Sequence, residues 1–280
     1  MKLLGALGLV FLFSQTVAFA QTPPVRPIDK PTLPTNGVFD TAGVKLGMTP
    51  AEVEAVVKQT TPNATMRRYQ NILEVSDNRG NKVPLEYLSN IEINSSDDAA
   101  GSNERIAVIF TTSLTETRAV SIDREVSWSN RAKQPNGNAL MDDIRQKYGD
   151  PSFEISGRPT NWSYLNWVWF KDQRVTFPAN DKRRLLYGPG NNRGNPESCV
   201  GGTHFVAPYQ FSAERTEPAP GCSALITIKV YHNGDLVPTV EFSMVDKNRY
   251  MQNARITDEW FSSEIAKKQG AEAPRARPRL

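Results

Sequence analysis

The chain has 280 residues, of which 39% are apolar and 22% are charged, and its formal net charge is +3. These values are ordinary for a globular protein, and the length suffices for one large domain or two small ones. The small net charge argues against a nucleic-acid-binding protein, because such proteins concentrate positive charge on one face.

The first twenty residues have the features of a secretory signal peptide. Lys2 precedes an apolar run, and Ala18-Phe19-Ala20 provides the small residues that signal peptidase accepts before Gln21. The apolar run is short for a membrane-spanning helix, and no other stretch is long and apolar enough. We expect cleavage of residues 1–20 and a soluble periplasmic protein without a transmembrane segment in the mature chain.

Proline-rich and basic segments flank the predicted folded region. Residues 21–37 are dense in proline and lack apolar periodicity, which is typical of an extended linker. Residues 270–280 carry three arginines and are predicted to form a disordered basic tail.

The segment FDTAGVKLGMTPAEVEAVVKQTTP, residues 39–62, predicts a short capped helix. Thr49 suits the N-cap, Pro50 the first helical position, and Glu52 completes a capping box with Thr49. The helix must end before Pro62. Three valines recur at helical spacing and would face a core: Val53, Val56 and Val57.

Four strand-like segments with alternating apolar residues follow this helix. They are NILEVSD (71–77), VPLEYLSNIEIN (83–94), ERIAVIFTTSL (104–114) and TRAVSIDREVSW (117–128). The last two flank a polar connection at 113–118, so we expect them to pair as a hairpin.

The pattern then returns about ninety residues later. NGNALMDDIRQKYGDP (136–151) predicts a second short helix, and strand candidates follow at 162–170, 174–178 and 224–246. Asn233-Gly234 predicts a tight turn inside the last segment. A final helix is expected near 257–269, with Thr257 as its cap and acidic residues in its first turn.

These elements predict an α+β fold made of two tandem units, each a short helix packed on an antiparallel sheet. The first unit would span residues 38–130, and the second residues 131–269 with the C-terminal helix. The sequence is compatible with one continuous sheet or two separate sheets, and it does not indicate an oligomeric state.

Residues 43–53, GVKLGMTPAEV, resemble the opening of the BamE (SmpA/OmlA) family of small periplasmic domains. The helix ending in KYGDP (147–151) is similar to helix ends in proteins that carry two such units. The β-lactamase inhibitory protein shares this tandem layout, which is an analogy of fold and not of ligand. The resemblance implies protein binding in the cell envelope and no catalytic residues. The chain departs from the family in lacking a lipid-accepting cysteine near the cleavage point.

Cys199 and Cys222 are the only cysteines, and an even count in an exported protein predicts a disulfide between them. A catalytic Cys199–His204 pair in the loop 188–210 would require a free thiol. A zinc site would need His232 as a further ligand, and the spacing matches no common motif. We therefore expect no cofactor and no metal.

The aromatic strand WSYLNWVWF (162–170) has two interpretations. Its side chains either pack in the core or form an exposed platform for a protein or a glycan. Together with His204, the candidate binding surface comprises Trp162, Tyr164, Trp167 and Trp169.

The sequence as a whole favours a non-enzymatic periplasmic protein that binds another envelope protein, and no residue is assigned a catalytic role. The alternative is a periplasmic hydrolase or a glycan-binding protein that uses the loop 188–210 or the strand 162–170.

Overall fold

The computed structural model describes residues 25–27, 39–156, 161–170, 173–175 and 222–271. In chain order the elements are α1 (Pro50–Thr60), β1 (Thr65–Ser76), β2 (Lys82–Asp97), β3 (Ser102–Phe110), β4 (Ala119–Trp128), the 3₁₀ turn η1 (Arg131–Lys133), α2 (Gly137–Tyr148), β5 (Phe153–Ser156), β6 (Trp162–Phe170), β7 (Gln173–Val175), β8 (Cys222–Asn233), β9 (Leu236–Asp246) and α4 (Lys247–Ala271). The predicted signal peptide, most of the linker and nearly all of the basic tail lie outside the described residues.

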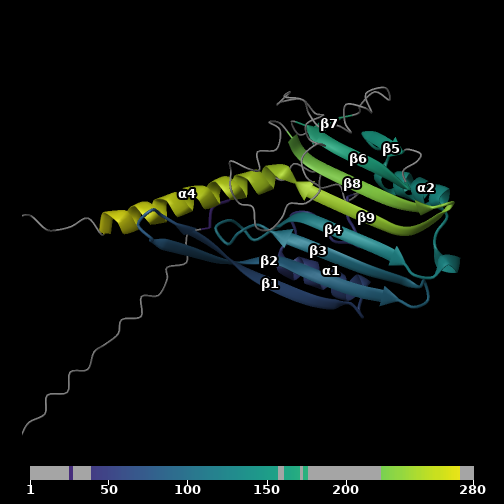
Figure 1. The fold of residues 1–280 in the computed structure, drawn as a ribbon, viewed down its shortest axis with the longest axis horizontal. Helices are drawn as coiled ribbons and strands as arrows, with labels where there is room; N and C mark the ends of the chain where they lie inside the picture. Colours follow the sequence, from purple (N-terminus) through teal and green to yellow (C-terminus); the bar gives the residue numbers. More distant parts are fainter. Residues whose placement is uncertain (1–24, 28–38, 157–160, 171–172, 176–221, 272–280) are drawn as a thin grey trace, which may run out of the picture.

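The described strands form one antiparallel sheet in the order β1-β2-β3-β4-β9-β8-β6-β5, with β7 paired to β6 (Figure 1). The predicted α+β class is confirmed by these helices and this sheet. β4 and β9 pair from Ser121 opposite Val245 to Ser127 opposite Thr239. This pairing joins strands from the two predicted units, so a single sheet runs through both.

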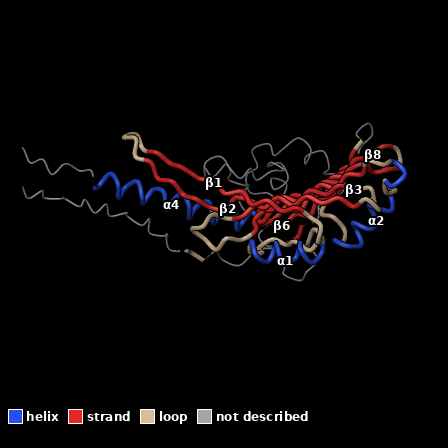
Figure 2. Tube along the Cα trace, turned by 90° about the horizontal axis from the view of Figure 1, so that it is seen from below, coloured by secondary structure: helices blue, strands red, loops and turns tan. Residues whose placement is uncertain are grey.

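The hydrophobic core lies between this sheet and the helices α1 and α2. Figure 2 shows both helices on the same side of the sheet, which is convex toward them. One cluster of buried side chains includes Val53 of α1, Ile91 of β2, Ile144 of α2 and Ile226 of β8. Each fully buried aliphatic side chain contributes about 1.5–3 kcal/mol. The core is therefore shared by both predicted units.

The predicted first helix and its capping box are confirmed. The Thr49 backbone N–H donates to Glu52 Oε2 at 2.7 Å, and the Glu52 N–H donates to Thr49 Oγ1 at 3.2 Å, which completes the capping box. The helix ends at Thr60, before Pro62. Two of its valines, Val53 and Val57, are buried.

The predicted hairpins are also present. β3 and β4 pair on either side of the connection at 111–118. β8 and β9 pair as expected, but Asn233 lies opposite Leu236, so Gly234 and Asp235 form the turn. Gly234 has a φ of 68°, a conformation that glycine adopts at little steric cost.

The predicted start of the last helix is wrong. α4 begins at Lys247, directly after β9, because the Asp246 carboxylate accepts a 2.9 Å hydrogen bond from the Arg249 N–H and so caps the helix there. Thr257 lies buried inside the helix, where its hydroxyl donates to the Asn253 carbonyl at 2.8 Å. This bond to the preceding turn removes the capping role that the sequence predicted for Thr257. Within the described residues, no helix is both long and apolar enough to cross a membrane.

Asn253 fixes α4 to the connection between β3 and β4. Its Oδ1 accepts hydrogen bonds from the Thr112 N–H at 3.0 Å, the Thr112 hydroxyl at 2.9 Å and the Thr115 hydroxyl at 2.9 Å. All three residues are buried. The same connection holds the linker, since the Arg26 N–H donates to the Leu114 carbonyl at 2.9 Å.

We predict that Asn253→Ala lowers the free energy of unfolding by about 2 kcal/mol, because it leaves a buried backbone N–H without an acceptor. Urea unfolding of the purified chain measures this loss. Arg255→Ala, on an exposed position of the same helix, is the control and should change the value by less than about 0.5 kcal/mol. Equal effects of the two substitutions would contradict this role of Asn253.

Candidate binding surface

The sheet face opposite α1 and α2, called here the polar face, carries hydrophilic side chains in rows across the strands. Ile106 and Val108 of β3 point into the core, so Arg105 and Ala107 point to the polar face, because successive strand residues alternate. The strand register places five side chains next to one another, one strand at a time: Arg105, Glu125, Glu241, Lys229 and Tyr164.

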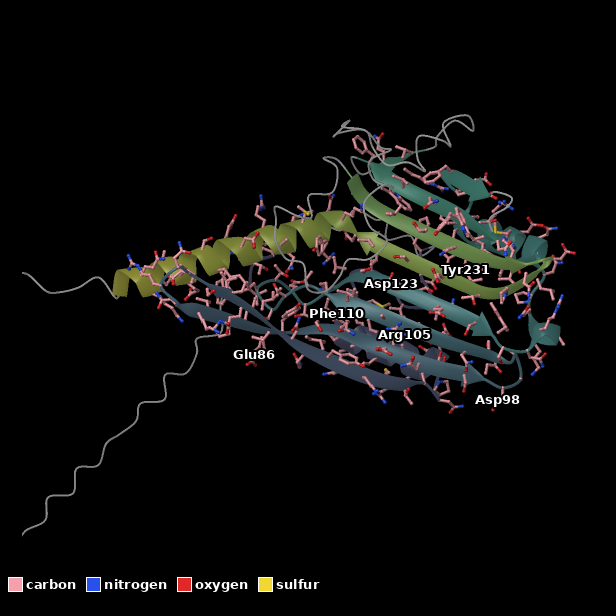
Figure 3. All side chains as sticks on the ribbon, in the orientation of Figure 1. Glu86, Asp98, Arg105, Phe110, Asp123 and Tyr231 are labelled. Carbon is pink, nitrogen blue, oxygen red and sulfur yellow. The ribbon has the colours of Figure 1, made fainter. Side chains whose placement is uncertain are left out.

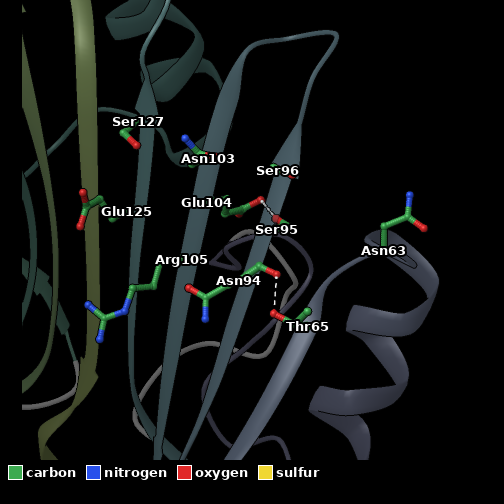
Figure 4. Close-up of a pocket in the computed structure, with 10 residues that line it drawn as sticks. All are labelled: Asn63, Thr65, Asn94, Ser95, Ser96, Asn103, Glu104, Arg105, Glu125 and Ser127. Carbon is green, nitrogen blue, oxygen red and sulfur yellow. Dashed lines mark hydrogen bonds between the residues drawn. The ribbon is translucent and has the colours of Figure 1, made fainter.

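Two hollows lie along this face and share Arg105 and Glu125. The first, of about 450 Å³, crosses β1 to β4 and is lined by amides, hydroxyls and charged groups (Figure 4). Its lining residues are Asn63, Thr65, Asn94, Ser95, Ser96, Asn103, Glu104, Arg105, Glu125 and Ser127. The second, of about 250 Å³, crosses β3, β4, β9, β8 and β6. Because they share two side chains, the two hollows are adjacent on this face.

Aromatic side chains from β6 and β8 stand beside the second hollow. Trp162 and Tyr164 meet edge to face, with ring centroids 4.5 Å apart. Lys229 Nζ lies 4.2 Å from the Tyr231 ring centroid and 5.5 Å from that of Tyr164. The Tyr231 hydroxyl donates to Glu241 Oε1 at 2.9 Å. These contacts order the lysine and the two tyrosines on the polar face.

Asp123 lies on the polar face of β4 at the second hollow, next to Arg105 in Figure 3. Its Oδ1 is buried and makes no hydrogen bond to the described residues. Burial raises the pKa of this carboxyl to about 6, although a hydrogen bond from Ser243 and the charge of Arg105 oppose the rise. Glu125, Glu241 and Lys229 are the other charged groups of the polar face that line this hollow.

The structure divides the predicted binding residues between the two faces. Trp167 and Trp169 are 0% and 2% exposed within the core, and Trp167 Nε1 donates to the Gly149 carbonyl at 3.2 Å. Of the two interpretations of this strand, core packing is therefore correct for these two residues and the exposed platform is wrong for them, because odd positions of β6 face the helices. Trp162 and Tyr164, at even positions, are half-buried on the polar face.

The predicted loop chemistry falls outside the described residues. Cys199 and His204 are not among them, and Cys222 is described only by its backbone, as the first residue of β8. The disulfide and the loop 188–210 therefore stay predictions. Among the described residues, no group of three or more side chains could hold a metal ion.

His232 forms a contact that the sequence did not predict. Its Nε2 lies 3.0 Å from the hydroxyl of the buried Ser163, within reach for a nucleophile and a base. A Cβ on Gly137 would lie 3.1 Å from Nδ1, so the other ring nitrogen faces the start of α2 instead of an orienting carboxylate. We interpret this pair as a structural contact that ties β6 and β8 to α2.

Sequence reasoning missed the charged residues of the central strands. The available signal was the charged or polar residue between apolar ones in SIDREVSW, TIKVYH and PTVEFSMV. The sequence does not show that these residues lie next to one another, because that follows only from the pairing of β4 with β9.

Comparisons with protein families, with curated proteins and with solved structures find no match to this chain.

We predict that Asp123→Asn stabilises the protein relative to wild type by about 2–3 kcal/mol more at pH 7.5 than at pH 4. The folded-state pKa of about 6 exceeds the usual aspartate pKa of 3.8, so the favourable contribution of the protonated carboxyl is lost as pH rises through 6. Urea unfolding at both pH values measures the difference.

Asp98→Asn, at an exposed carboxylate, serves as the control and should stay within about 0.5 kcal/mol of wild type at each pH. A difference between wild type and Asp123→Asn that is constant with pH would refute the assigned burial of Asp123.

Proposed function

We propose that this chain is an exported, non-enzymatic protein that binds another envelope protein through the polar face of its sheet. The observation that carries the proposal is the pair of adjacent hollows across β1 to β6, on the side of the sheet opposite α1 and α2. Such a concave surface is suited to receive a convex segment of a partner.

The dimensions favour a macromolecule over a small molecule. Neighbouring strands lie about 4.8 Å apart, so the seven strands from β1 to β6 separate Thr65 from Tyr164 by about 29 Å. A stable interface buries about 800 Å² on each partner, which a surface of this width supplies. Tyrosine, tryptophan and arginine are enriched at such interfaces, and the polar face presents Trp162, Tyr231 and Arg105.

We also propose that the sheet consists of two tandem, BamE-like units. The support is the repeated order of a helix followed by an antiparallel meander, first α1 with β1 to β4 and then α2 with β5, β6, β8 and β9. The order of charges across the β4–β9 junction also supports two units. From β3 to β8 it is cation, acid, acid, cation, so each unit contributes one cation and one acid in mirrored order: Arg105, Glu125, Glu241 and Lys229. Residues 43–53 resemble the opening of BamE-family domains, and this resemblance implies a protein as the binding partner.

Site-specific photo-crosslinking tests the function. The chain is expressed in a bacterium with its own leader, and a benzophenone amino acid replaces Ser127 or Thr239 on the polar face. Matched controls replace the exposed Lys58 on α1 or Asp143 on α2. We expect a mature periplasmic chain that starts at Gln21, and one protein adduct common to both polar-face positions and absent from both helix positions.

Adducts from the helix positions alone, or none from Ser127 and Thr239, would overturn the proposed binding surface. Retention of an uncleaved chain in the cytoplasm would overturn the proposed export.

A further inference from the structure

The second hollow lies where β4 meets β9, and its acidic groups come from both strands. Glu125 and Glu241 are directly opposite each other in the register, and like charges in such positions destabilise a sheet. Glu125 is exposed, and the Glu241 side chain is 43% exposed, so both are accessible. A cation between them would remove this repulsion.

The basic groups around the hollow already have acidic partners. Arg105 Nε lies 3.4 Å from Glu92 Oε1, Lys229 Nζ lies 3.9 Å from Glu241 Oε2, and Arg124 pairs with Glu104. Among the described residues, neither Asp123 nor Glu125 belongs to an ion pair. Within the part of the chain that the structure describes, Glu125 is therefore the acidic group of the hollow that no cation pairs with or is seen to act on.

The size of the hollow indicates what could occupy it. Its volume of about 250 Å³ is below the range of about 300–1,000 Å³ that is usual for small-molecule pockets. It suits one side chain better than a whole free ligand. Tyr164 lines the β6 side of the hollow, and Lys229 Nζ lies 5.5 Å from its ring centroid.

We propose that this hollow receives an arginine side chain of the protein partner, with its guanidinium between Glu125 and Glu241 and beside Asp123. The inference rests on the proposed binding function and specifies the chemistry of the partner. A guanidinium fits because its planar donors can reach carboxylates on two strands at once. The paired cations Arg105 and Lys229 border the site and disfavour additional positive charge on either side.

The test uses N-acetyl-arginine methylamide as the probe and N-acetyl-citrulline methylamide as its neutral counterpart. The complete mature chain, labelled with ¹⁵N, is titrated with each probe and observed by NMR. We expect saturable shifts at the amides of Asp123, Glu125 and Glu241 with a Kd in the millimolar range, which is usual for a single side-chain contact. The citrulline probe should give no such shifts.

Substitutions then locate the site. Glu125→Gln and Glu241→Gln should each weaken binding of the arginine probe at least about threefold, because each removes one carboxylate from the pair. Glu86→Gln, on β2 and away from the hollow in Figure 3, should leave the affinity unchanged. The unshifted remainder of each spectrum shows that the variant is folded.

Equal shifts with both probes, no saturable shift over the millimolar range, or equal weakening by Glu86→Gln would each overturn the inference. Photo-crosslinking to a partner without arginine-probe binding would refute this inference alone. Arginine-probe binding without any crosslink would refute the proposed function and leave only a cation site.

Discussion

The pairing of β4 with β9 is the interaction on which the rest of the structure depends. It joins strands separated by more than a third of the chain and makes one sheet from two sets of strands. Its register places Val126 opposite Val240 on the core side and Glu125 opposite Glu241 on the polar side. A shift of one residue would exchange these faces, because side chains alternate along a strand. The register of β4 with β9 therefore determines both the core and the candidate binding surface.

The two faces of this sheet have different physical tasks. The side packed against α1 and α2 buries Phe110, Leu165 and Trp167, each 0% exposed, and supplies the hydrophobic stabilisation of the fold. The opposite side holds a buried carboxyl, Asp123, and two opposed glutamates, both of which cost stability. Local features that oppose stability concentrate at functional sites, and here they coincide with the hollow. This coincidence is why we place binding on that side.

The features predicted correctly from the sequence are those that depend only on residues close together in the chain. The capping box of Thr49 and Glu52, the stop before Pro62 and the hairpin of β3 and β4 all follow from local chemistry. The start of α4 was missed because Asp246 ends a strand and caps a helix at once, a role that only the paired β9 reveals. Alternation put Trp167 and Trp169 on one face, but only the strand neighbours of β6 decide that this face is the core. The row of side chains from Arg105 to Tyr164 likewise could not be predicted, because the β4–β9 register brings its two halves together.

Native-state hydrogen exchange of the complete mature chain tests the single sheet most directly. If the β4–β9 pairing unites the fold, amides at 121–127 and 239–245 should be among the slowest to exchange, and should open with the free energy of global unfolding. Exchange of these amides at a clearly lower free energy, while the strands β2, β3, β6 and β8 remain protected, would show two separable halves. That result would contradict a continuous polar face.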